Sequence, residues 1–224
     1  MAQCFPESRI WDHPIELKPN APSTILGKVY QLTQGEQKAL LDFMTEQQAK
    51  GYICPSKSPY AAPFFFIKKK DGKLQPMQDY QWLNEWTIKN HYPLPLISEL
   101  IVQVQNTKIF TKVNIRWGYN NICIKEGDEY KVAFITNQGL FEPTVMFFGL
   151  TNSPAMFQTM INAIFAPEIA EGWLIVYMDD ILLPPKTTQS SMKNAFTVYW
   201  RNYDYMTYTS SQKSASLNND EWSS

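Results

Sequence analysis

Apolar positions recur along this chain at two spacings, one helical and one alternating, and they predict a mixture of helices and strands. The clearest helix begins at Thr33, because Glu36 three residues later completes a capping-box pattern. Gly51 suits the end of the same helix. Its apolar face comprises Ala39, Leu40, Phe43 and Met44. We interpret this helix as structural.

A second helix is predicted after Ser153, where Pro154 suits the first helical position. Its inward positions are Met156, Phe157, Met160, Ile161 and Ile164. Strand-like runs precede it, among them Phe110–Ile115 and Tyr130–Thr136, and turn residues separate them. Antiparallel hairpins joined by helices predict an α+β fold rather than a doubly wound one.

The run from Trp173 to Leu183 is the most informative stretch, because two carboxylates interrupt an otherwise apolar strand pattern. Burying Asp179 and Asp180 would be costly unless a cation met them. A turn at the pair would place both acids at a hairpin tip, where clustered oxygen ligands suit a hard divalent cation such as Mg²⁺. The alternative is an ordinary surface turn, in which Asp is common.

A second hairpin is predicted at Asp71-Gly72, a strong two-residue turn signal. Lysines gather near its tip at Lys68, Lys69, Lys70 and Lys73. They could protect the strand edges, as lysine often does. They could instead form a basic finger that contacts phosphates. The motif alone leaves both interpretations open.

Composition and charge narrow the function classes. Hydrophobic residues make up 44% of the 224 residues, so a sizeable core is possible. The net charge of −1 gives no global attraction to nucleic acid or membrane, so any polyanion contact must come from a local patch. The three cysteines lack metal-site spacing and support neither a disulfide framework nor a zinc site. Without a signal peptide or long apolar run, we expect an intracellular protein, cytoplasmic or nuclear, with no membrane partner.

Several short motifs, specific in their combined order and spacing, resemble the fingers and palm of a reverse transcriptase from a gypsy-class LTR retrotransposon. The resemblance covers about Trp11 to Leu183. Its markers are Ser56-Lys57-Ser58-Pro59, Phe65–Gly72, Leu83-Asn84, Lys89–Pro95, Phe110-Thr111-Lys112, Phe148–Ala155 and Tyr177-Met178-Asp179-Asp180. The resemblance implies a polymerase palm, which is a ferredoxin-like antiparallel sheet backed by helices, with a fingers subdomain. The chain departs from the family in that we expect the thumb to be absent.

We expect an extended arm over residues 1–30, fingers over 31–95 and a palm with some fingers residues over 96–183. Because the resemblance stops after Leu183, we expect residues 184–224 to be disordered or translated out of frame, so the chain would be truncated.

The resemblance also implies RNA-directed DNA polymerisation by two-metal nucleotidyl transfer, with two Mg²⁺ ions. Asp179 and Asp180 match two of the three metal carboxylates, and Ile115 matches a backbone carbonyl ligand. The third carboxylate position is Asn114, which keeps a carbonyl oxygen but loses the negative charge. We therefore expect a degraded active site with weakened metal binding.

The nucleotide pocket implied by the resemblance departs from the family pattern too. Lys69 matches the lysine that holds the triphosphate, whereas Gln75 stands at an arginine position. Tyr119 matches the aromatic beneath the sugar, although the pattern alone would make it a core tyrosine. Phe148 and Gly149 match the pocket floor. We expect Lys68, Lys70 and Lys73 to contact the nucleic acid.

Three functional hypotheses remain open at this point. The first is an impaired polymerase that uses dNTPs and an RNA or DNA template with its primer. The second is a non-catalytic remnant, or pseudoenzyme, that binds nucleic acid weakly. The third is a decayed element copy without function. The oligomeric state is left open.

Overall fold

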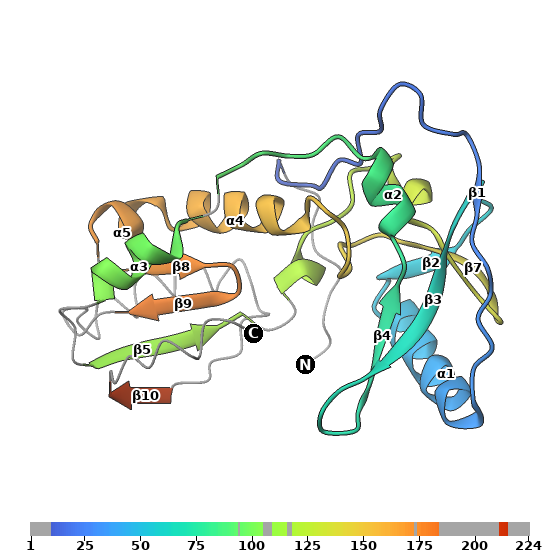
Figure 1. Cartoon of the computed structure of the whole chain (residues 1–224), viewed down its shortest axis with the longest axis horizontal. Coiled ribbons are helices and arrows are strands. Elements are labelled where there is room, and N and C mark those ends of the chain that lie inside the picture. Colours follow the sequence, from blue (N-terminus) through green and yellow to red (C-terminus); the bar gives the residue numbers. More distant parts are fainter. Residues whose placement is uncertain are drawn as a thin grey trace. The chain divides into compact units, whose positions relative to one another are not determined.

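The computed structural model describes residues 10–93, 95–104, 109–115, 118–172, 174–183 and 211–214 (Figure 1). The chain divides into two compact units. The first comprises Met1–His91 and Gly118–Phe157, and the second comprises Tyr92–Trp117 and Gln158–Ser224. Each unit is described by itself, and the expected fingers and palm boundaries stay predictions.

The first unit contains a mixed six-stranded sheet. Its strands are β1 (Ile25–Leu26), β2 (Ile53–Pro55), β3 (Tyr60–Lys68), β4 (Leu74–Gln78), β6 (Phe134–Thr136) and β7 (Gly139–Pro143). They run in the order β1-β3-β6-β7-β2, with β4 also paired to β3. The hairpins β3–β4 and β6–β7 are antiparallel, as expected, whereas the pairs β1–β3 and β3–β6 are parallel.

Helix α1 (Gln34–Ala49) follows the sequence prediction closely. Thr33 is its N-cap, and both hydrogen bonds of the capping box with Glu36 are present. Gly51 takes the left-handed conformation just beyond its end, with φ of 73°. Leu40 and Met44 of this helix are buried in one cluster with side chains of the sheet and of the segments next to it, namely Tyr52, Ile53, Phe64, Phe134, Phe141, Val145 and Phe147. Packing of this amphipathic face therefore forms the core of the first unit.

Shorter helices fill the remaining connections of the first unit. They are α2 (Gln81–Trp86) and two 3₁₀ turns, η1 (Gly118–Asn121) and η2 (Glu129–Val132). The predicted strand over Tyr130–Thr136 is thus shorter than expected, because its first residues form η2 and only β6 is extended. The described part of the chain contains no helix that is long and apolar enough to cross a membrane.

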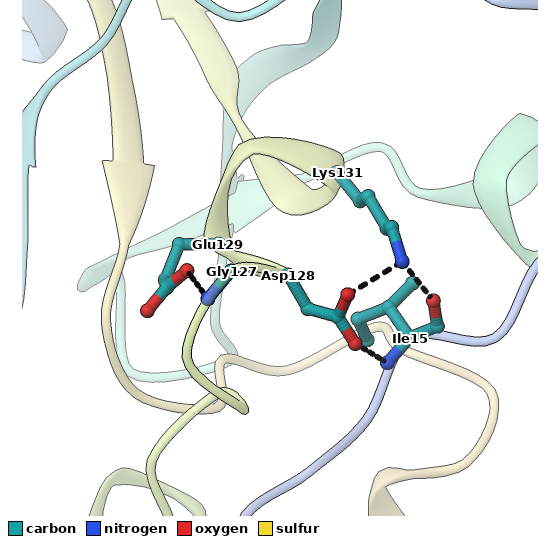
Figure 2. A network of polar contacts seen from close by, with 5 residues as sticks. All are labelled: Ile15, Gly127, Asp128, Glu129 and Lys131. Atoms are coloured by element: carbon teal, nitrogen blue, oxygen red, sulfur yellow. Dashed lines mark hydrogen bonds and ion pairs between the residues drawn. The ribbon is translucent and has the colours of Figure 1, made fainter.

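Residues 12–18, which we call the strap, are packed onto the first unit through backbone and side-chain hydrogen bonds. The His13 amide donates to the Cys123 carbonyl at 2.8 Å, and the Ile88 amide donates to the Glu16 carbonyl at 2.8 Å. Figure 2 shows a third attachment, where the Ile15 amide donates to Asp128 Oδ2 at 2.8 Å. Lys131 Nζ binds the Ile15 carbonyl at 2.8 Å and also pairs with Asp128. The strap is therefore a fixed part of the unit.

The second unit contains a four-stranded antiparallel sheet in the order β10-β5-β9-β8. Its strands are β5 (Ile109–Asn114), β8 (Ile175–Tyr177), β9 (Asp180–Leu183) and β10 (Ser211–Ser214), and its helices are α3 (Ile97–Val104) and α5 (Ala166–Ala170). Helix α4 (Ser153–Ile164) begins in the first unit and ends in the second. Leu100 of α3 packs against Ile175 and Leu182. The antiparallel pairing expected here is confirmed.

The tail over residues 184–224 was expected to lack regular structure. Within it the structure describes only β10, which pairs antiparallel with β5. The expectation that the tail is disordered or out of frame stays a prediction, because the rest of residues 184–224 lies outside the described residues.

Candidate functional site

The carboxylate pair lies at the tip of the β8–β9 hairpin. Tyr177 pairs with Asp180, so Met178 and Asp179 form the connecting turn. Asn114 of the neighbouring strand β5 is the register partner of Asp180. The Ile115 amide donates to the Asp179 carbonyl at 2.8 Å. The backbone thus brings four of the predicted catalytic or metal-binding positions to one end of the second unit's sheet.

The two carboxylates of this hairpin have different surroundings. Asp179 Oδ1 is buried without a hydrogen-bond partner. Burial, and secondly the neighbouring charge of Asp180, raise the pKa of Asp179. Asp180 Oδ2 instead forms an ion pair with Lys112 Nζ at 2.7 Å. A cation is therefore supplied to one acid by the chain itself, while the other has an oxygen that a cation could satisfy.

The oxygen ligands at this hairpin suit a hard cation, but they carry fewer negative charges than the family pattern has. Carboxylate and carbonyl oxygens are the ligands that Mg²⁺ prefers. Within the described ranges, however, no group of three or more His, Cys, Asp or Glu side chains could hold a metal ion. Asn114, the register partner of Asp180, is the position at which the resemblance implies a third carboxylate. The observed arrangement can offer two negative charges where the family pattern offers three.

The predicted pocket residues of the first unit lie together. The Tyr119 ring is 5.0 Å from that of Phe148 and 5.5 Å from that of Phe157, in edge-to-face contacts. Tyr119 is 8% exposed and Phe148 is 41% exposed, so Phe148 presents a ring surface while Tyr119 is largely enclosed. Both the core and the pocket interpretations of Tyr119 are compatible with this packing.

Gly149 is held in a conformation that disfavours other residues. Its φ is 102°, and an added Cβ would lie 3.4 Å from the Gln78 carbonyl oxygen. Asn84 fixes this segment from both sides, because its Nδ2 donates to the Gly149 carbonyl at 2.7 Å and its Oδ1 accepts from the Thr151 amide at 2.8 Å. In the sequence, Leu83-Asn84 was only a family marker. The structure shows that Asn84 holds the segment around Gly149 through two hydrogen bonds.

The basic hairpin is formed by β3 and β4, but its turn is longer than the predicted two residues. The Lys69 amide donates to the Lys73 carbonyl, and the Gly72 amide donates to the Lys69 carbonyl, each at 2.9 Å. With Gly72 at φ of 80°, this is a three-residue loop with a glycine bulge. The lysines at its tip, Lys68, Lys69, Lys70 and Lys73, are all exposed.

Charge and polarity near this tip are uneven. Lys73 Nζ lies 3.6 Å from Asp71 Oδ2, so one of the lysines is partly neutralised. Gln75 pairs with Ile67 across the hairpin, and its Nε2 contacts Met77 Sδ at 3.7 Å. Lys69 and Gln75 therefore belong to the same hairpin, as their predicted roles require, although those roles stay predictions.

Two residues that contact the carboxylate hairpin were not singled out from the sequence. Lys112 belongs to a family marker, but its ion pair with Asp180 depends on the β5–β9 register. Gln158 is fully buried in α4 and accepts a hydrogen bond from the Met178 amide. The available signal was a polar residue between the apolar positions Phe157 and Met160.

The fold is similar to that of part of a solved viral protein. The structure of the foamy viral protease-reverse transcriptase in complex with an RNA/DNA hybrid has a TM-score of 0.73 and 18% sequence identity, covering 89% of this chain and 26% of that chain. The same viral protein in complex with dsDNA has a TM-score of 0.75 and 19% identity, covering 91% and 41%. At these identities the likeness shows the fold alone.

Residues 67–216 match the family described as reverse transcriptase (RNA-dependent DNA polymerase), and the chain belongs to that family. The Transposon Tf2-3 polyprotein of Schizosaccharomyces pombe is 39% identical over 165 residues, covering 74% of this chain. The Transposon Tf2-7 polyprotein of the same yeast is 38% identical over 165 residues. The chain spans 12% of the length of these polyproteins. The predicted kinship with retrotransposon reverse transcriptases is thus confirmed.

The family match also bears on the tail. It continues to residue 216, past Leu183, where we expected the resemblance to end. The predicted break in resemblance is therefore not confirmed.

Proposed function

We propose that this chain is the fingers and palm part of an RNA-directed DNA polymerase in which Asn114 has reduced or abolished catalysis. The observation that carries the proposal is the register of β5 against β9, which pairs Asn114 with Asp180 beside the turn that carries Asp179. A third metal-binding carboxylate would occupy residue 114, and an asparagine there removes one of three charges. If that charge contributes several kcal/mol at the transition state, its loss slows catalysis by roughly a thousandfold.

Magnesium fits the acids that remain. The unpartnered, buried oxygen of Asp179 is a group that a cation would satisfy. Asp179 and Asp180 would hold the metal, together with the backbone carbonyl of Ile115. When bound, such ions lower the pKa of an attacking hydroxyl and stabilise the charge that develops on the phosphate. Lys112 competes for Asp180, with which it is already paired at 2.7 Å.

The first unit would supply the nucleotide contacts. Lys69, exposed on the β3–β4 loop, is available to bind a triphosphate. Gln75 is neutral where a second cation would strengthen that binding, so we infer a raised KM for dNTPs. Tyr119 would lie beneath the sugar, next to the exposed ring of Phe148, whose centroid is 5.0 Å from that of Tyr119.

Primer extension on a primed RNA template tests the proposal. The unaltered chain and Asn114→Asp are compared, each alone and each fused to the segment that follows this region in the Tf2-3 polyprotein. We expect Asn114→Asp to extend the primer faster, by roughly a hundredfold to a thousandfold. Asp179→Asn in the Asn114→Asp background is the control and should return activity to background. Equal extension by the unaltered chain and Asn114→Asp would contradict the proposed impairment.

A second candidate function is binding of nucleic acid without catalysis. The observation that favours it is the exposed lysine loop of the β3–β4 hairpin, a feature that does not need the carboxylates. The foamy viral protein of the same fold is described in complexes with an RNA/DNA hybrid and with dsDNA. If the chain is instead a decayed copy, neither extension nor salt-sensitive duplex binding should be measurable.

The expectation that residues 184–224 are translated out of frame, against which the family match to residue 216 speaks, has a separate test. The nucleotide sequence beyond codon 183 is translated in the other two frames and searched for palm and thumb sequence. Finding such sequence in neither frame would contradict the frameshift.

A further inference from the structure

The turn that carries Asp179 has an unusual backbone conformation. Met178 has φ of 54° and is the only non-glycine residue with positive φ among the described residues. Two-residue hairpin turns need positive φ at their first position and usually place glycine or asparagine there. Methionine has no side-chain group that favours this conformation. Some other part of the second unit must therefore stabilise the turn.

Gln158 of α4 provides that contact. Its side chain is fully buried, and its Oε1 accepts the Met178 amide at 2.8 Å. A backbone amide can only donate, so the oxygen end of the glutamine must face the turn. The Nε2 end then points the other way, where it donates to Asn162 Oδ1 at 2.8 Å and to the Val176 carbonyl at 3.5 Å. Both ends of the amide are satisfied, which fixes its orientation.

Asn162 links the Gln158 side chain to one further residue of the second unit, Tyr92. Asn162 lies one helical turn after Gln158, and its Nδ2 donates to the Tyr92 hydroxyl at 2.9 Å. The order Tyr92, Asn162, Gln158, Met178 is thus a continuous chain of hydrogen bonds. We call Tyr92, Asn162 and Gln158 the brace. Gln158 is buried, whereas Asn162 and Tyr92 are half-buried. Linked polar groups that satisfy one another hold one arrangement more firmly than isolated bonds do.

The carboxylate of Asp179 depends on the backbone that the brace holds. The Met178 amide is fixed by Gln158, and the Asp179 carbonyl is fixed by the Ile115 amide at 2.8 Å. By contrast, Asp179 Oδ1 has no hydrogen-bond partner. The direction of that oxygen is therefore set by the conformation of the turn.

We propose that Gln158, oriented by Asn162 and Tyr92, is a positioning residue that holds Met178 in the left-handed conformation and so aims the Asp179 carboxylate at its cation. The inference rests on the proposed function for its metal part only, because the conformational part concerns the turn itself. Gln158 touches neither substrate nor metal in this scheme and acts through the Met178 amide.

The test uses the full chain with two readouts. Hydrogen exchange at the Met178 amide reports the turn, and water-proton relaxation with Mn²⁺ alone reports the carboxylates. Gln158→Met removes both polar ends at similar length. We expect exchange at Met178 to accelerate, and Mn²⁺ affinity to fall, by about twofold to tenfold, as loss of one buried hydrogen bond implies. Gln158→Glu keeps an oxygen toward Met178 and should keep the slow exchange.

Ile161→Val is the matched control, because Ile161 is fully buried on the same helix and has no polar end. It should leave both readouts unchanged. Unchanged exchange in Gln158→Met, or equal acceleration in Ile161→Val, would overturn the inference. Mn²⁺ binding that survives Asp179→Asn would overturn the proposed metal role instead, while the exchange result would still decide whether the brace holds the turn.

Discussion

His13 is a buried, titratable residue of the strap, and its protonation makes the stability of the fold depend on pH. It is 1% exposed, and neither ring nitrogen has a hydrogen-bond partner. Burial lowers its pKa from 6.5 to about 4, although the negative charge of Asp128 acts in the opposite direction. Asp128 is itself held by the Ile15 amide and Lys131 (Figure 2). The imidazole is therefore neutral in the folded chain at neutral pH.

This burial predicts a loss of stability in acid. Between pH 6.5 and about 4 the unfolded chain binds a proton at His13 that the folded chain does not. The stability contributed by a neutral His13 is thus complete above pH 6.5 and falls as the pH decreases, by up to about 3 kcal/mol. Urea unfolding at a series of pH values measures this loss.

His13→Leu supplies the comparison, because leucine cannot bind a proton. The difference in unfolding free energy between the two chains should depend on pH only through the titration of His13. If the difference in unfolding free energy between the two chains stays constant from pH 7 to pH 4, burial does not lower the pKa of His13.

At the scale of elements, α1 was predictable because its signals are local. Thr33 and Glu36 are three residues apart, and Leu40 and Met44 lie on one face of the same helix. The β8–β9 hairpin was predictable for a similar reason, since Asp179 and Asp180 interrupt one apolar run. Such signals lie within a few neighbouring residues, so these elements can be predicted without knowledge of the rest of the fold.

Pairings between distant segments could not be predicted in this way. Ala62 of β3 pairs in parallel with Phe134 of β6, and nothing in either short strand specifies that partner. Gln158 and Met178 are 20 residues apart, so the role of Gln158 emerges only once α4 packs beside the hairpin. The four described residues of β10 likewise lie in a polar tail whose sequence shows no strand alternation. Tertiary contacts override local propensity at these positions.

The capping box of α1 gives a prediction at this scale. Thr33→Ala removes the side chain that accepts from the Glu36 amide, and it should lower the unfolding free energy by about 1 kcal/mol. Thr45→Ala is the matched control, because Thr45 is exposed within the same helix and only bonds the Leu41 carbonyl. That change should be neutral or slightly stabilising, since alanine is the better helix former. Equal losses in urea unfolding would argue against a specific cap.

At the scale of the whole molecule, the distribution of charge matters more than its sum. The chain has a net charge of −1, so it has no general attraction to a polyanion. The lysines of the β3–β4 loop are a local exception. Lys73 lies 3.6 Å from Asp71, and Lys68 is close enough to Glu36 to help lower the pKa of that carboxyl. Binding to an RNA–DNA duplex would therefore depend on a few phosphate contacts and weaken steeply with salt.

That dependence can be measured with a variant in which Lys68, Lys69 and Lys70 are all glutamine. Each lysine that neutralises a phosphate releases counterions, so the slope of log affinity against log salt should become less steep by about 3 when all three are lost. Lys125→Gln is the control, because Lys125 is exposed in the same unit but outside the hairpin, and it should leave the slope unchanged. Fluorescence anisotropy of a labelled duplex over a salt series gives both slopes. Identical slopes for the triple variant and the unaltered chain would show that this loop does not contact phosphate, and duplex binding would then have to come from another surface.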